Sequence, residues 1–264
     1  MPCRIHGPVP MLYVNGEVMS VHALQLPQMN GLRPASQLIP QGFPVDGELS
    51  GVLPWPRLRP GAVIGVTSRA SAGVTSLVLT LLAGPSKAGA WCAVVGAARL
   101  SASAASHVGV KLSHLALVPD SAGRDNQVAG VLMEGMDVVA LRLNASVHQK
   151  DAVRLAAKAR RNGSVLVPFG SESARWPGTD AQLVVSQVRW HGLREGRGLL
   201  RHCSLTVSSV VRGQHRHVTL YPYGRPEPET SRVHGRLASV VSLVDRKHMR
   251  KGGARSAGSG RAVS

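Results

Sequence analysis

The sequence predicts an α/β fold in which a mostly parallel sheet lies between helices and continues into an antiparallel extension. Continuous apolar runs recur between residues 62 and 167, and runs of this kind are typical of parallel strands buried on both faces. Segments with helical spacing of apolar residues separate these runs. After about residue 181, shorter apolar segments are joined by Gly- and Arg-rich turns, which favours antiparallel pairing.

The expected parallel strands are short and rich in Val, Leu and Ala. They are residues 62–66, 91–95, 115–118, 137–141 and 164–167. The expected antiparallel strands are residues 182–190, 204–211 and 217–221. Because only 3% of the chain is aromatic, small and medium-sized aliphatic side chains must fill the core.

The sequence indicates where two helices begin or end. The first carries one apolar stripe at i, i+3, i+4, i+7 and i+8, formed by Val74, Leu77, Val78, Leu81 and Leu82. We expect it to stop at Gly84-Pro85, since proline disrupts a helix interior. For the second, Ser146 and Gln149 have the spacing of a capping box, and Asn162-Gly163 closes the helix.

Composition divides the chain into three parts. Residues 1–48 contain several Pro and Gly without sustained periodicity, so we expect a poorly ordered leader. Residues 49–224 form the expected core domain. Residues 225–264 are rich in Arg, Gly, Ser and Pro, which predicts a basic, largely disordered tail. One apolar island at residues 237–244 interrupts this tail and is expected to order on a partner.

The charge balance points to a polyanionic partner. The chain has 31 Lys+Arg against 14 Asp+Glu, a formal net charge of +17, which favours nucleic acid first and an acidic protein surface second. The alternative is a high-GC genome, which favours Arg, Ala, Gly and Val at solvated positions. Cys3, Cys92 and Cys203 are isolated, which argues against a disulfide framework or a zinc site. With no run of roughly 18 apolar residues and no secretion signal, we expect a cytoplasmic protein without membrane contact.

The first strand and helix flank a turn that is related to the phosphate-binding loop G-x-x-x-x-G-K-[ST]. In that loop, backbone N–H groups surround phosphates and the Lys neutralises their charge. Here Gly73 and Thr75 stand in register, but Ser68 replaces the first Gly and Val74 replaces the Lys. The vestigial loop, which also includes Ser76, therefore predicts an ATPase fold used without ATP hydrolysis. The alternative is an ordinary strand-to-helix turn.

The order and spacing of these segments resemble the RecA recombinase core. The resemblance covers roughly residues 50–224 and implies a RecA-like P-loop core. It rests on the degenerate loop at 68–76, the strand segment at 89–95, the segment 108–119, and the antiparallel strands at 182–190, 205–211 and 218–221.

The resemblance assigns family functions to particular positions, and most of these have lost the required side chain. The phosphate-binding Lys of the family falls on Val74, whereas the adjacent hydroxyl, a Mg²⁺ ligand there, is kept as Thr75. The acid that activates water falls near Ala98. The acid ending the Walker B strand falls on Arg142, where a cation would repel Mg²⁺, and the nucleotide-sensing residue falls near Phe169-Gly170. The resemblance thus implies a pseudo-ATPase without catalytic residues, cofactor or metal.

Among RecA-like proteins with eroded nucleotide motifs, the chain most resembles the ImuA-prime group of actinobacterial mutasomes. This implies a non-catalytic accessory protein in DNA-damage-induced mutagenesis and translesion DNA synthesis. Such a protein would be cytoplasmic and nucleoid-associated, and would scaffold a polymerase-like adaptor of the ImuB type. The expected contacts with the adaptor or with DNA are Leu237, Val240, Val241, Leu243, Val244, Arg246, Lys247, Arg250 and Lys251.

Two other functions are alternatives. One is a divergent DNA-dependent ATPase of the RecA class, in which Arg69 or Arg99 of a neighbouring subunit replaces the lost charge. The other is a regulator of RecA filaments or of cell division.

Overall fold

The computed structural model describes residues 11–14, 17–20, 42–45, 47–70, 72–194, 197–211 and 214–225. Its strands are β1 (Met11–Val14), β2 (Glu17–Ser20), β3 (Ile64–Ser68), β4 (Cys92–Val95), β5 (Leu115–Asp120), β6 (Val138–Arg142), β7 (Val165–Phe169), β8 (Ala181–Arg194), β9 (Arg197–Val211) and β10 (Gln214–Leu220). Its α-helices are α2 (Gly47–Ser50), α3 (Val74–Lys87), α4 (Ala102–Val108), α5 (Asp125–Leu132) and α6 (Gln149–Asn162). Two 3₁₀ helices are η2 (Leu112–His114) and η3 (Ser171–Arg175).

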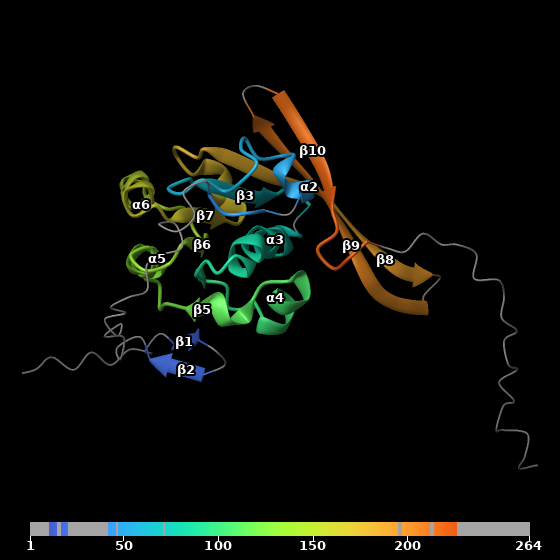
Figure 1. Cartoon of the computed structure of the whole chain (residues 1–264), viewed down its shortest axis with the longest axis horizontal. Coiled ribbons are helices and arrows are strands. Elements are labelled where there is room, and N and C mark those ends of the chain that lie inside the picture. The colour runs from blue at the N-terminus through green and yellow to red at the C-terminus, as the bar shows by residue number, and fades with distance from the viewer. Residues whose placement is uncertain are drawn as a thin grey trace, which may run out of the picture. The chain divides into compact units, whose positions relative to one another are not determined.

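The strands form one mixed sheet in the order β10-β9-β8-β3-β7-β6-β4-β5-β1-β2 (Figure 1). The six strands from β8 to β5 in this order run parallel to their neighbours. At one end β9 and β10 add antiparallel pairs, and at the other end β1 pairs antiparallel with β5 and β2. The predicted fold class, mostly parallel with an antiparallel C-terminal part, is confirmed. The architecture is compatible with a RecA-like core.

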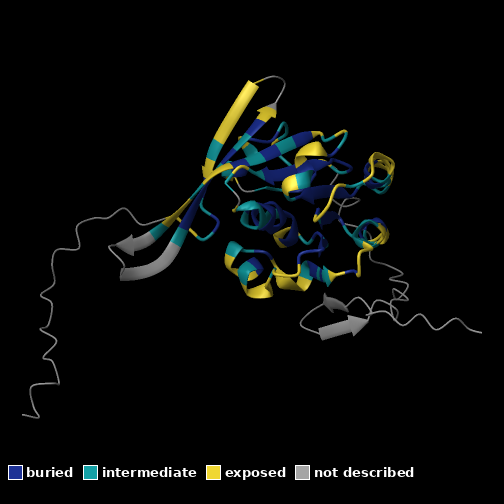
Figure 2. Cartoon of the chain, turned by 180° about the vertical axis from the view of Figure 1, so that it is seen from behind, coloured by how far each residue is buried: buried dark blue, intermediate teal, exposed yellow. Residues whose placement is uncertain are grey.

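Helices cover both faces of the parallel sheet, and the side chains of each strand alternate between them. Cys92 and Val94 of β4 pack in the cluster that contains α3, whereas Ala93 and Val95 pack in the cluster that contains α5 and α6. Figure 2 shows this layering as buried strands beneath helices whose outer sides are exposed. The continuous apolar runs therefore indicated two buried faces correctly.

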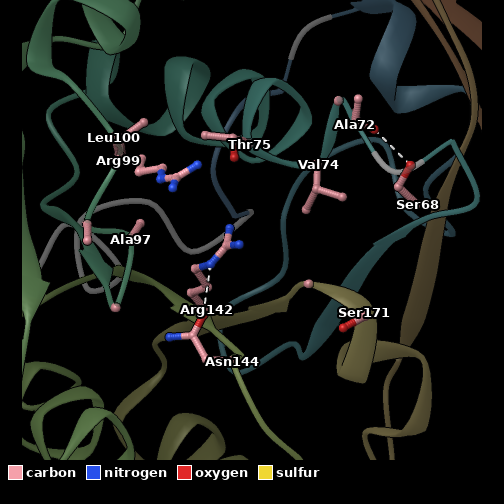
Figure 3. Close-up of a pocket in the computed structure, with 14 residues that line it drawn as sticks. Ser68, Ala72, Val74, Thr75, Ala97, Arg99, Leu100, Arg142, Asn144 and Ser171 are labelled. Atoms are coloured by element: carbon pink, nitrogen blue, oxygen red, sulfur yellow. Dashed lines mark hydrogen bonds between the residues drawn. The ribbon is translucent and has the colours of Figure 1, made fainter. Parts of the chain in front are cut away.

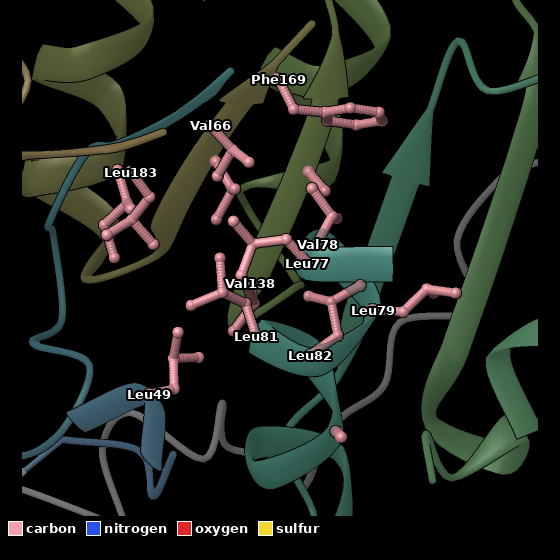
Figure 4. Close-up of a cluster of buried hydrophobic side chains, with 14 of the residues drawn as sticks. Leu49, Val66, Leu77, Val78, Leu79, Leu81, Leu82, Val138, Phe169 and Leu183 are labelled. Carbon is pink, nitrogen blue, oxygen red and sulfur yellow. The ribbon is translucent and has the colours of Figure 1, made fainter. Parts of the chain in front are cut away.

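Helix α3 fills the centre of the larger cluster. Leu77, Leu81 and Leu82 are fully buried there among side chains of the strands (Figure 4). The predicted end of this helix at Gly84-Pro85 is wrong, because α3 runs on to Lys87 with Pro85 inside it. Gly84 is needed for close packing instead, since a Cβ there would lie 2.3 Å from the backbone oxygen of Pro44.

Helix α6 begins later than the sequence predicts. Its N-cap is His148, and no side chain caps it, so the capping box of Ser146 and Gln149 is wrong. The Ser146 hydroxyl instead donates a hydrogen bond of 2.7 Å to Oε2 of Glu172, which draws it away from the helix. The predicted C-terminal end is confirmed, because Gly163 is the C-cap.

The packed core starts before the predicted boundary at residue 49. Phe43 is fully buried and exchanges two backbone hydrogen bonds of 2.9 Å with Leu58. Strands β1 and β2 also fall within the expected leader; most of its remaining residues lie outside the described ranges.

The chain divides into two units, residues 1–226 and 227–264. The second unit contains all the predicted contacts from Leu237 to Lys251, and these lie outside the described residues.

Candidate functional site

A pocket of about 750 Å³ opens where four parallel strands end at the same edge of the sheet (Figure 3). In open α/β sheets, ligands bind at the carboxyl ends of the strands, so this is the expected place for a site. The lining comes from the ends of β3, β4, β6 and β7 and from the start of α3. It consists of Ser68, Ala72, Gly73, Val74, Thr75, Gly96, Ala97, Ala98, Arg99, Leu100, Arg142, Asn144, Gly170 and Ser171.

The loop between β3 and α3 has the predicted strand–turn–helix form. Gly73 is the N-cap of α3 and has a left-handed backbone with φ of 84°, which favours glycine. A Cβ at Gly73 would also lie 2.9 Å from Cγ2 of Val188 on β8. Both the backbone angle and the close approach of β8 therefore favour glycine at this position.

Ser68 occupies the inside of the loop with its own hydroxyl. Its Oγ donates to the backbone oxygen of Ala72 at 2.7 Å and accepts from the N–H of Ala70 at 3.0 Å. In a working phosphate loop, the backbone N–H groups point at the ligand instead. Ser68 stands where the motif has its first glycine. Its hydroxyl accepts a hydrogen bond from a loop N–H group, in the place where a phosphate oxygen would accept one in a working loop.

The other predicted loop residues differ in what they contact. Val74, at the position where the phosphate-loop motif has a Lys, places an aliphatic side chain in the pocket, and Thr75 also lines the pocket. Ser76 does not line it; its hydroxyl lies 3.3 Å from the hydroxyl of Tyr223. The structure therefore brings together four of the five predicted loop residues, and the fifth, Ser76, forms a hydrogen bond with Tyr223 instead.

Ala98 and Arg142, which the resemblance to RecA predicts at acidic positions of that family, line the same pocket. Arg142 ends β6, and its Nε donates to Oδ1 of Asn144 at 3.0 Å. Its guanidinium carbon lies 6.0 Å from the ring centroid of Phe169, within the range of a cation–π contact. Arg99 also projects into the pocket (Figure 3), although the sequence suggested it only as a residue acting on a neighbouring subunit.

The lining of the pocket holds two arginines and no carboxylate. Glu172, beside Ser171, is engaged elsewhere: the hydrogen bond from Ser146 holds the pKa of its carboxyl below the ordinary value, and Arg175 adds to this effect. Within the described ranges, no group of three His, Cys, Asp or Glu is placed to hold a metal ion. The pocket therefore favours an anion and disfavours a divalent cation.

A protein-family match covers the part of the chain that contains this pocket. The model of a protein family described as the MT3502 N-terminal domain matches residues 51–178, just under half of the chain. A protein of Mycobacterium tuberculosis named "Uncharacterized protein Rv3395c" is 34% identical over 125 residues, which are 47% of this chain and 58% of that protein. The chain thus matches less than two thirds of that relative's length. Every residue that lines the pocket falls inside residues 51–178.

The part of the chain that the structure describes has no helix long and apolar enough to cross a membrane.

Proposed function

We propose that this protein is a non-catalytic RecA-like accessory factor in DNA-damage-induced mutagenesis, where it scaffolds a polymerase-like adaptor during translesion DNA synthesis. The charge reversal in the pocket carries this proposal. Arg142 stands at the end of β6 where a RecA-type enzyme needs a metal-holding acid, and Val74 stands where it needs a Lys. A protein that keeps the fold but reverses this charge is better suited to binding partners than to hydrolysis.

The size of the loss supports a role without ATP hydrolysis. A hydrogen bond to a charged group is worth about 1.5–3 kcal/mol, so the missing Lys alone weakens nucleotide binding roughly ten- to a hundredfold. Phosphoryl transfer also relies on metal ions to neutralise the developing charge. Arg142 repels such an ion, and Ala98 has no group that could activate water.

The exposed side of α6 supports a contact with DNA. Lys150, Arg154 and Arg161 are exposed at i, i+4 and i+11, which places them along one side of the helix. No described acid forms an ion pair with any of the three, and repulsion between like charges this close on a helix is unfavourable. Phosphates of a DNA backbone would relieve this repulsion, and such binding weakens steeply with salt.

The source of the mycobacterial relative agrees with an actinobacterial mutasome protein. The family match covers β3 to η3, the region in which the nucleotide motifs are eroded.

The function of the adaptor-binding tail is inferred from its sequence, in which an apolar island is followed by a cluster of basic residues. Burying Val and Leu side chains contributes about 25 cal/mol per Å², and flanking cations speed the encounter with an acidic partner.

Deleting residues 227–264 is expected to abolish capture of the ImuB-type adaptor in a pull-down from cells that express both proteins. The packed unit of residues 1–226 contains the described core, so its thermal unfolding should be unchanged. A matched variant that keeps the tail but replaces Arg246, Lys247, Arg250 and Lys251 with Gln is expected to retain part of the capture, because the island stays. Undiminished capture by the truncated protein would refute the docking role of the tail.

A divergent DNA-dependent ATPase is the second candidate, and one observation favours it: Thr75 keeps its hydroxyl in the lining of the pocket. Regulation of RecA filaments or of cell division is a further alternative. Co-sedimentation with RecA filaments in the absence of the adaptor would favour that role over the mutasome role.

A further inference from the structure

Among the residues that the structure describes, the two arginines of the pocket have no carboxylate partner. Arg142 uses its Nε on the neutral amide of Asn144, and no described Asp or Glu lies within ion-pair distance of Arg142 or Arg99. Both guanidinium groups project into the same cavity from the ends of different strands (Figure 3). Two neighbouring cations without an anion repel each other, and a bound anion removes this repulsion.

The start of α3 adds to the positive potential at the same place. The helix has 14 residues, its first turn lines the pocket, and no side chain caps it. The first N–H groups of a helix have no partner within the helix, and its dipole favours negative charge there. The loop itself is closed by the Ser68 hydroxyl, so an anion would lie on the side of Arg99 and Arg142 rather than within the loop.

We propose that this pocket is a metal-independent site for a small phosphate anion of the pyrophosphate type. The inference rests on the proposed function, because it assumes that the site no longer holds a magnesium–nucleotide complex. The arginines replace the charge that Mg²⁺ supplies in an ATPase, and their planar forks suit paired phosphate oxygens. Thr75, Asn144 and Ser171 offer further polar groups in the lining.

The pocket is large enough for more than one phosphate group. Its volume of about 750 Å³ lies within the range of small-molecule sites, roughly 300–1,000 Å³. The same phosphate chemistry has two sources: an inorganic polyphosphate, or the phosphates of a free nucleotide. Both would bind without the metal, which separates this site from the ATP site of an active RecA-type enzyme.

Calorimetric titration of the full-length protein with pyrophosphate in EDTA tests the proposal. We expect binding that Mg²⁺ does not strengthen, and a loss of roughly ten- to a hundredfold in affinity in both Arg99→Gln and Arg142→Gln. Arg216→Gln, an exposed arginine on the edge strand β10, is the matched control and should bind like the parent. Thermal unfolding of each variant shows whether it is folded, and the exposed Arg99 gives the cleaner comparison because it makes no described side-chain hydrogen bond.

ATP in EDTA identifies the source of the phosphate. Tighter binding than pyrophosphate indicates a nucleotide, and weaker binding indicates an inorganic anion; either result supports the site when it depends on Arg99 and Arg142. No binding of either compound in EDTA, tighter binding with Mg²⁺, or equal binding by both Gln variants would overturn the proposal. Adaptor capture measured with the same variants separates the two ideas, because the capture is assigned to the tail and should survive loss of the anion site.

Discussion

Replacing Leu81 with alanine is expected to lower the free energy of unfolding by about 2–5 kcal/mol. Leu81 is fully buried on α3 in the cluster that joins this helix to the sheet (Figure 4). Truncation removes buried apolar surface and leaves a cavity beneath the sheet, because the surrounding side chains can only partly move in to fill it. Urea denaturation followed by circular dichroism measures the change.

Val153→Ala is the matched control for this prediction. Val153 lies on α6 with 53% of its surface exposed, so its truncation should change the free energy of unfolding by no more than about 0.5 kcal/mol. Equal losses in the two variants would contradict the placement of α3 in the core and of this side of α6 in solvent.

Gly170→Ala is expected to destabilise the protein by about 2–4 kcal/mol and to disturb the pocket. Gly170 follows β7 with φ of 123° and ψ of −173°, a region that is almost restricted to glycine and costs other residues about 1–3 kcal/mol. A Cβ there would also lie 2.9 Å from the backbone oxygen of Leu143, so one of the two backbone segments must move. Because Gly170 lines the pocket, this movement should weaken pyrophosphate binding as well as stability.

Gly178→Ala separates the cost of the steric clash with Leu143 from the cost of a positive φ. Gly178 also has a positive φ, of 67°, but a Cβ there would meet no atom within 4 Å. We expect a loss of about 1 kcal/mol and unchanged anion binding. If Gly170→Ala lowered the melting temperature and the pyrophosphate affinity no more than Gly178→Ala does, the close contact between Gly170 and Leu143 would be contradicted.

The parallel sheet was predictable from the sequence because each strand is buried on both faces. The run Cys92–Val95 is apolar on both of its alternating faces, so it contributes side chains to both buried clusters. The errors lie where tertiary contacts override local signals. Gly84-Pro85 has the composition of a helix end, but the close approach of Pro44 makes this glycine a packing position within α3. Ser146 has the spacing of a cap, but Glu172 binds its hydroxyl.

The site was predictable only in part. The loop from Ser68 to Thr75 follows a linear motif, and the resemblance to RecA marked Ala98 and Arg142, which the structure places in the same pocket. The convergence of Arg99 with Arg142 could not be found in the same way, because it depends on how β4 and β6 end beside each other. The closure of the loop by the Ser68 hydroxyl likewise depends on backbone geometry that the motif does not specify.

The loss of ATP hydrolysis that we propose for this pocket is tested most directly by a phosphate-release assay with ATP, Mg²⁺ and single-stranded DNA. We predict no release above the background of the buffer, with or without DNA, because the pocket is lined by Arg142 and Val74 where the proposed RecA-type site would need an acid and a Lys. DNA-stimulated release that is lost in Thr75→Ala would contradict the account, since it would show that the retained hydroxyl still serves a working nucleotide site.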